Sequence, residues 1–165
     1  MKRAVVTSSS SCLEALGLSQ GMDILRLHVN INNVDFIDGK NITKKLSAPA
    51  AFVANLFDIK PIMQINQIGE IIAVEKVRKL EKTLITMGKT VEKLAANQPA
   101  FIYLTDTGHH ESTEFFKKLL ATYFGWHDLP VIRVSTISLA NHGLMGTGIG
   151  VFYGELPHIV KALKK

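Results

Sequence analysis

The stretch Ala100-Phe101-Ile102-Tyr103-Leu104-Thr105 has the composition of a fully buried β-strand, because its residues are apolar, aromatic or β-branched throughout. A predicted helix follows, beginning near Glu111 with acidic residues in its first turn, which suits the helix dipole, and ending at Gly125. Its aromatic and leucine residues, including Phe115 and Tyr123, are expected to form a wide apolar face. Residues 130–135 are again strand-like. A strand, a helix and a strand in this order allow a parallel strand pair, so the stretch indicates an α/β fold.

Upstream, residues 75–96 carry apolar side chains at spacings of three and four, which predicts one amphipathic helix. Two hairpins are predicted before it. Residues 24–29 and 34–37 flank an Asn-rich turn, and residues 59–65 and 70–74 flank Gly69. His28 falls on the polar phase of its strand and is expected at the surface. We therefore expect an α/β (α+β) fold with a mixed sheet, built from two hairpins and strand-helix-strand units.

The bulk composition excludes several classes of protein. Of the 165 residues, 47% are hydrophobic, which fits a globular chain. The net charge of +5 is scattered and lacks the aromatic interleaving of single-strand binders, so no nucleic acid is expected. Cys12 is the one cysteine, which excludes an internal disulfide and fits a cytoplasmic location. His109 and His110 adjoin Asp106 but lack a suitably spaced further ligand, so no metal is expected. The apolar runs are too short for stable membrane insertion.

Two polar stretches are candidate ligand sites. His142 stands at the head of four closely spaced glycines within residues 141–150. Either these glycines turn the backbone so that its N–H groups and His142 face an anion, or they form a plain bend between strands. Residues 7–11 are a run of hydroxyls after a short strand, which is either an anion cradle at a helix N-terminus or an ordinary helix cap.

The order of motifs resembles the DegV family. Residues 6–13 are similar to its opening hydroxyl-rich motif, and residues 25–43 are similar to its following hairpin. Residues 55–62, Asn-Leu-Phe-Asp-Ile-Lys-Pro-Ile, resemble its Asn-Leu-Leu-x-Ile-Lys-Pro-Ile signature, with Gly69, Lys76 and Arg78 in register. Residues 142–148 are similar to its terminal His-x-Gly-Pro-Gly-Ala region.

The resemblance implies a truncated family member. Ile42-Thr43 is followed at once by Lys44-Lys45-Leu46-Ser47, so most of the family's N-terminal domain has no counterpart here. Both acids of the opening motif are replaced, by Ser8 and Cys12. We expect residues 1–43 to be a remnant of the first domain and residues 44–165 to be the lipid-chain domain, together forming one compact unit.

The resemblance also implies a function. The chain is expected to be a carrier, not an enzyme, holding a long-chain fatty acid in an apolar tunnel without a cofactor. The apolar faces of residues 80–94, 101–104 and 115–124 either line such a tunnel or fill one another as an ordinary core. Its carboxylate is expected to be bound by His142, Gly143, Ser9, Ser10 and Thr7. A fatty acid kinase subunit and a homodimer are the implied partners. Two alternatives stay open: a ligand-free scaffold or regulatory remnant acting through dimerisation or protein contact, and an enzyme with His142 as general base.

Overall fold

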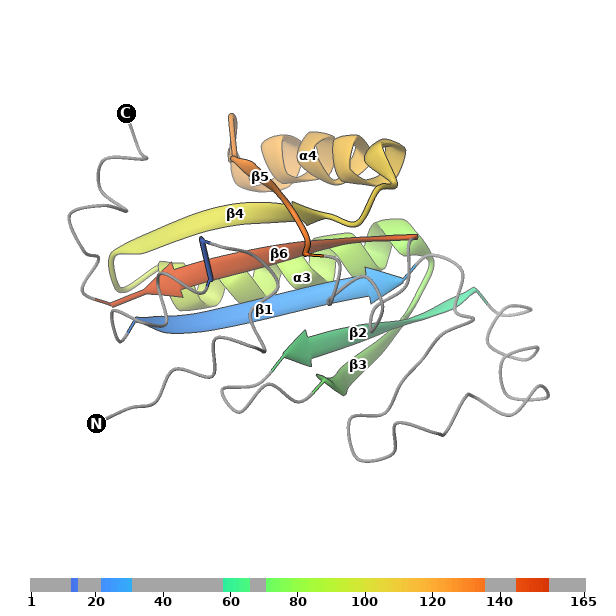
Figure 1. Ribbon diagram of the computed structural model, residues 1–165, viewed down its shortest axis with the longest axis horizontal. Helices are drawn as coiled ribbons and strands as arrows, with labels where there is room; N and C mark the ends of the chain where they lie inside the picture. The colour runs from blue at the N-terminus through green and yellow to red at the C-terminus, as the bar shows by residue number, and fades with distance from the viewer. Residues whose placement is uncertain (1–12, 15–21, 31–57, 66–70, 136–144, 155–165) are drawn as a thin grey trace.

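The structure, a computed structural model, describes residues 13–14, 22–30, 58–65, 71–135 and 145–154. They form a six-stranded sheet in the order β3-β2-β1-β6-β4-β5, with two long helices (Figure 1). The elements are β1 (Asp23–Asn30), β2 (Ile59–Ile65), β3 (Ile71–Arg78), α3 (Leu80–Ala95), β4 (Ala100–Asp106), α4 (His110–Phe124), β5 (Val131–Arg133) and β6 (Gly146–Tyr153).

The sheet is mixed, as predicted. β4 and β5 are parallel and are joined through α4, whereas all other neighbouring strands are antiparallel. The predicted antiparallel pairing of β2 with β3 is confirmed. The predicted hairpin partner of β1, residues 34–37, lies outside the described residues. β1 instead pairs with β2 on one side and with β6 on the other, near the middle of the sheet.

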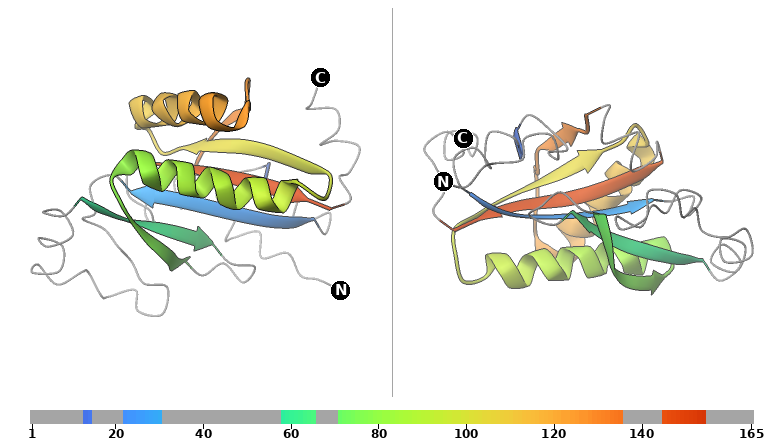
Figure 2. Two further views of the ribbon diagram at one scale, coloured as in Figure 1. Left: turned by 180° about the vertical axis from the view of Figure 1, so that it is seen from behind. Right: turned by 60° about the horizontal axis from the view of Figure 1, so that its bottom comes forward.

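Both described helices pack on the same face of the sheet, and Figure 2 shows α3 lying along it. Side chains alternate between the two faces of a strand, so one set of residues from β1, β4 and β6 meets the helices. This core holds Leu27, Val29, Leu84, Met87, Val91, Leu104, Phe116, Leu120, Ile149 and Val151. The predicted helix stripe is therefore confirmed at Leu84, Met87 and Val91.

Three sequence predictions about these elements were wrong. Residues 75–78 belong to β3, and the helix begins only at Leu80. Lys79, between them, takes a left-handed backbone conformation with φ of 70°, which ends the strand before the helix starts. Phe115 and Tyr123, expected on the apolar face of α4, are exposed by 38% and 56%. His28, expected at the surface, is buried, because the face of the sheet opposite the helices is covered as well.

The predicted domain boundary, between residues 43 and 44, lies outside the described residues and stays a prediction. β1, from the first predicted segment, pairs with β2 and β6 from the second. Among the described helices, neither has the length and apolar character that a membrane-spanning helix requires.

Candidate functional site

The face of the sheet opposite α3 and α4, called here the second face, carries polar side chains over a row of glycines. Every second residue at the start of β6 is a glycine, and these glycines, Gly146, Gly148 and Gly150, lie on this face. A Cβ on Gly146 would come within 2.5 Å of His28, and a Cβ on Gly148 within 2.5 Å of Thr105. The prediction that these glycines make a turn was wrong: all three lie in the extended strand β6. They make room for side chains from the neighbouring strands β1 and β4.

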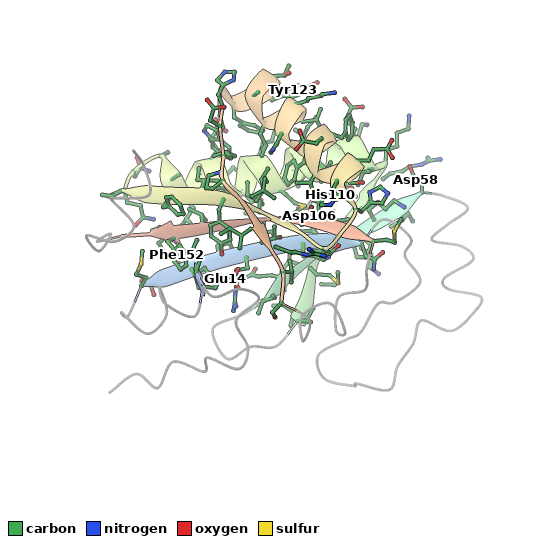
Figure 3. The ribbon with its side chains drawn as sticks, turned by 45° about the horizontal axis from the view of Figure 1, so that its top comes forward. Glu14, Asp58, Asp106, His110, Tyr123 and Phe152 are labelled. Carbon is green, nitrogen blue, oxygen red and sulfur yellow. The ribbon has the colours of Figure 1, made fainter. Side chains whose placement is uncertain are left out.

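A buried charge cluster lies beside this row. The hydroxyl of Tyr103 donates to Oε1 of Glu14 over 2.6 Å, and Oε2 of Glu14 lies 3.6 Å from Nη1 of Arg26. Glu14 is fully buried and Arg26 is 4% exposed. Figure 3 shows Glu14 on the opposite side of the sheet from α4. The cluster thus fixes Leu13 and Glu14, which are far from β4 in the sequence, against the sheet.

Burial raises the pKa of Tyr103 well above its ordinary value, and the charge of Glu14 and the hydrogen bond to it raise the pKa further, while Arg26 lowers it. Tyr103 is therefore neutral near pH 7 and acts as a hydrogen-bond donor to the carboxylate. Such a donor is well suited to a buried carboxylate, because it adds a hydrogen bond without adding charge.

A small pocket of about 20 Å³ adjoins the cluster. That volume is enough for roughly one water molecule. Its lining comprises Glu14, Arg26, Leu27, His28, Ile65, Thr105, Val134 and Ile149. The pocket therefore combines a guanidinium, an imidazole, a hydroxyl and a carboxylate.

The other half of the second face is apolar. Met22, Ile24, Phe101, Tyr103 and Phe152 form a buried cluster, against which Leu13 and Ile132 pack. The rings of Tyr103 and Phe152 lie 5.6 Å apart, centroid to centroid. Tyr103 therefore belongs to both halves: its ring is in the apolar cluster and its hydroxyl is in the charged one.

A separate polar cluster lies where β4 ends and α4 begins. Asp106, which is buried, accepts a hydrogen bond from the backbone N–H of Gly108 over 2.7 Å and forms an ion pair with His110 (Figure 3). Nδ1 of His109 lies 2.7 Å from the Ser112 hydroxyl and accepts from its backbone N–H, which caps the helix. In the described ranges, no group of three or more His, Cys, Asp or Glu side chains is placed to hold a metal ion.

The predicted carboxylate ligands His142, Gly143, Ser9, Ser10 and Thr7 all lie outside the described residues. Sequence reasoning missed Glu14, Arg26 and Tyr103. The available indication was an arginine inside the predicted strand 24–29, flanked by Leu25 and Leu27, because a charged side chain there needs a partner if both faces are covered.

The side chains expected to line an acyl tunnel pack against one another in the described part of the chain. Leu84 and Met87 of α3 meet Phe116 and Leu120 of α4 and Leu104 of β4 in a single core, and all five are fully buried. The space between helices and sheet is thus an ordinary close-packed core.

Comparison with known proteins identifies the family to which this chain belongs. The model of the DegV family, described as an uncharacterised protein of that family, matches residues 45–154. The chain belongs to the DegV family. A DegV domain-containing protein of Streptococcus pyogenes serotype M1 is 24% identical over 115 residues, which cover 70% of this chain and 39% of that protein. The chain thus spans well under half of that DegV relative.

Solved structures share the fold. The fatty acid binding DegV family protein of Streptococcus agalactiae superposes with a TM-score of 0.60 at 22% identity, covering 85% of this chain and 53% of the other. The fatty acid kinase B3 protein of Streptococcus pneumoniae, loaded with linoleic acid, gives 0.56 at 16% identity, covering 86% and 48%. At these identities the likeness establishes the DegV fold.

Proposed function

We propose that this chain binds a long-chain fatty acid and holds it without chemical change. The observation that carries the proposal is the shared fold with two DegV proteins, one described as fatty acid binding and the other loaded with linoleic acid. This chain covers about half of each of those two proteins. The proposal is therefore limited to the fatty-acid contacts that residues of this chain would make.

The carboxylate is bound, in this proposal, by His142, the backbone N–H of Gly143, and the hydroxyls of Ser9, Ser10 and Thr7. Chain connectivity supports the grouping. Ser10 is joined to Glu14 and His142 to Gly146 by stretches that extend over at most about 14 Å, at about 3.5 Å per residue. Glu14 and Gly146 both lie on the second face. Both candidate stretches are therefore joined, within a few residues, to residues of this face.

The acyl chain gains about 0.8 kcal/mol for each methylene that it buries. We place it against the apolar half of the second face, around Phe101, Phe152 and Ile24, where it would take the place of Leu13. The opposite face is filled by α3 and α4. The partners proposed with this function are a separate fatty acid kinase subunit, to which the carrier presents the carboxylate, and a second copy of the chain. The cytoplasm is the proposed location.

A second candidate function is a ligand-free scaffold or regulatory protein. The close-packed core under α3 and α4 favours it, as does the water-sized pocket beside Glu14, because neither offers an acyl chain a preformed tunnel. The two candidates differ in one measurable property, which is the affinity for fatty acid.

Titration of the wild type and the His142→Ala variant with oleate, followed by calorimetry, tests the proposal. We expect micromolar or tighter binding by the wild type and a loss of about 10-fold or more in the variant, since a hydrogen bond to a charged group contributes roughly 1.5–3 kcal/mol. His127→Ala is the matched control, because that histidine is exposed in the segment that follows α4. Equal oleate affinity in all three proteins removes His142 from the site, and no binding favours the scaffold.

A further inference from the structure

The proposed carboxylate donors lack a fixed positive charge. Thr7, Ser9, Ser10 and Gly143 are neutral, and a buried carboxylate is costly unless a cation lies close to it. In the parts of the chain that are described, two Lys or Arg side chains are buried, Arg26 and Lys60. Lys60 is held by Asp58 at 3.3 Å. Arg26 is the one on the second face, beside the pocket.

Glu14 presents a carboxylate, the same chemical group as the head of a fatty acid, to Arg26 and Tyr103. One of its carboxylate oxygens accepts the Tyr103 hydroxyl at 2.6 Å and the other lies 3.6 Å from the guanidinium. Leu13, the preceding residue, packs against the apolar cluster of the second face. Leu13 and Glu14 thus place apolar atoms against the apolar cluster and a carboxylate beside a buried cation.

We propose that Arg26 and Tyr103 form the charged end of the fatty-acid site, and that Glu14 occupies this place until the carboxylate of the fatty acid replaces it. The inference rests on the proposed function, to which it adds the cation and an internal competitor. Arg26 neutralises the acid, and Tyr103 donates to one of its oxygens.

The exchange is energetically feasible because it keeps the charges balanced. One carboxylate leaves the guanidinium and another arrives, so the buried cation is compensated in both states. Glu14 regains its hydration when it leaves, and the acyl chain covers the apolar surface that Leu13 had covered. Glu14 therefore sets a threshold: it lowers the apparent affinity for fatty acid by the free energy of its own contact.

Replacing Glu14 by glutamine tests the exchange. Glutamine keeps the shape and an oxygen that accepts from Tyr103 but removes the negative charge, so oleate competes against a weaker occupant. By calorimetry we expect Glu14→Gln to bind oleate about 5- to 30-fold more tightly than the wild type. The matched control is Glu114→Gln, which removes an exposed carboxylate 2.7 Å from Lys117 and is expected to leave oleate affinity unchanged.

Hydrogen exchange on the wild type gives a readout that depends on no variant. Saturating oleate is expected to speed exchange in the peptide that contains Leu13 and Glu14 and to slow it in the peptide that contains Arg26. If the wild type binds oleate but Glu14→Gln binds it no more tightly and exchange at Leu13 and Glu14 does not rise, the inference is overturned while fatty-acid binding stands. If neither protein binds oleate, the proposed function fails and the exchange fails with it.

Discussion

The phenol ring of Tyr103 lies directly over the backbone of Gly150: a Cβ at that glycine would come within 2.1 Å of the ring carbon Cζ. The ring has little freedom to withdraw, because its hydroxyl is bound to Glu14 and the ring packs against that of Phe152. The glycine in β6 and the tyrosine in β4 are thus one steric unit, on which the charged cluster of the second face depends.

Gly150→Ala is therefore expected to destabilise the fold by about 3 kcal/mol, the upper part of the range for overpacking a core. For a domain of this size, this corresponds to a loss of roughly 6–12 °C in Tm. In a Tyr103→Ala background the same substitution is expected to cost much less, since the obstructing ring is gone. A double-mutant cycle by urea unfolding measures this coupling, and additive effects of the two changes would contradict the steric relationship.

The close approach of α3 and α4 depends in the same way on Gly88. A Cβ there would lie 2.6 Å from Cε2 of Phe124 and 3.0 Å from Cδ2 of Leu120. Alanine gains about 1 kcal/mol of helix propensity, but the overlap is expected to cost more, giving a net loss of roughly 1 kcal/mol in Gly88→Ala. With Phe124→Leu already present, the propensity gain is expected to reappear as a net stabilisation. Thermal unfolding of the four proteins decides the sign.

The raised pKa of Tyr103 predicts how stability depends on alkaline pH. The folded protein holds the phenolic proton more tightly than the unfolded chain, whose tyrosines titrate near 10.0. The stability due to this group is therefore complete below pH 10 and falls as pH rises further, by up to about 1.4 kcal/mol per pH unit.

Tyr103→Phe is expected to lose about 1–3 kcal/mol at pH 7, because the buried carboxylate of Glu14 loses a donor. Above pH 10 its stability is expected to fall less steeply than that of the wild type. Tyr153, whose pKa is also raised by burial and by Asp23, is present in both proteins and its contribution cancels. Free energies of unfolding are measured with urea for both proteins between pH 9 and 11. If they fall with pH at the same rate in the wild type and in Tyr103→Phe, the burial of a neutral Tyr103 is contradicted.

The two partners of the ion pair between Asp106 and His110 are expected to contribute very unequally to the stability of the fold. Asp106 is 5% exposed and also binds the backbone N–H of Gly108, so Asp106→Ala is expected to cost about 1.5–3 kcal/mol. The His110 side chain is 81% exposed, and His110→Ala is expected to cost under about 1 kcal/mol. Urea unfolding compares the two, and equal losses would mean that the ion pair, rather than the turn, is what Asp106 supports.

Local patterns were enough to predict much of the fold. The apolar run 100–105 became β4, and the acidic start and Gly125 stop bounded α4 closely, because these features act within a few residues. The helix at residues 75–96 was predicted too long, since Val77 fits both a helix stripe and a strand. Neither glycine nor proline marks the break at Lys79, where a left-handed backbone ends β3.

The second face depended on information that no local pattern carries. The glycines of β6 were expected to make a turn. They instead lie in a strand where a side chain would not fit, because His28, Thr105 and Tyr103 reach over them from neighbouring strands. His28 was expected at the surface because it lies on the polar phase of β1, and that reasoning fails when both faces of a sheet are covered. Partners far apart in the sequence, such as Glu14 and Tyr103, become visible only in the structure.

Native mass spectrometry of the purified wild type mixed with a small excess of oleate tests the central claim most directly. We predict a one-to-one protein–oleate complex that survives gentle desolvation and disappears when the fatty acid is replaced by a long-chain alcohol lacking the carboxylate. A spectrum that shows only the bare protein, although oleate is present in molar excess, would contradict fatty-acid binding by this chain.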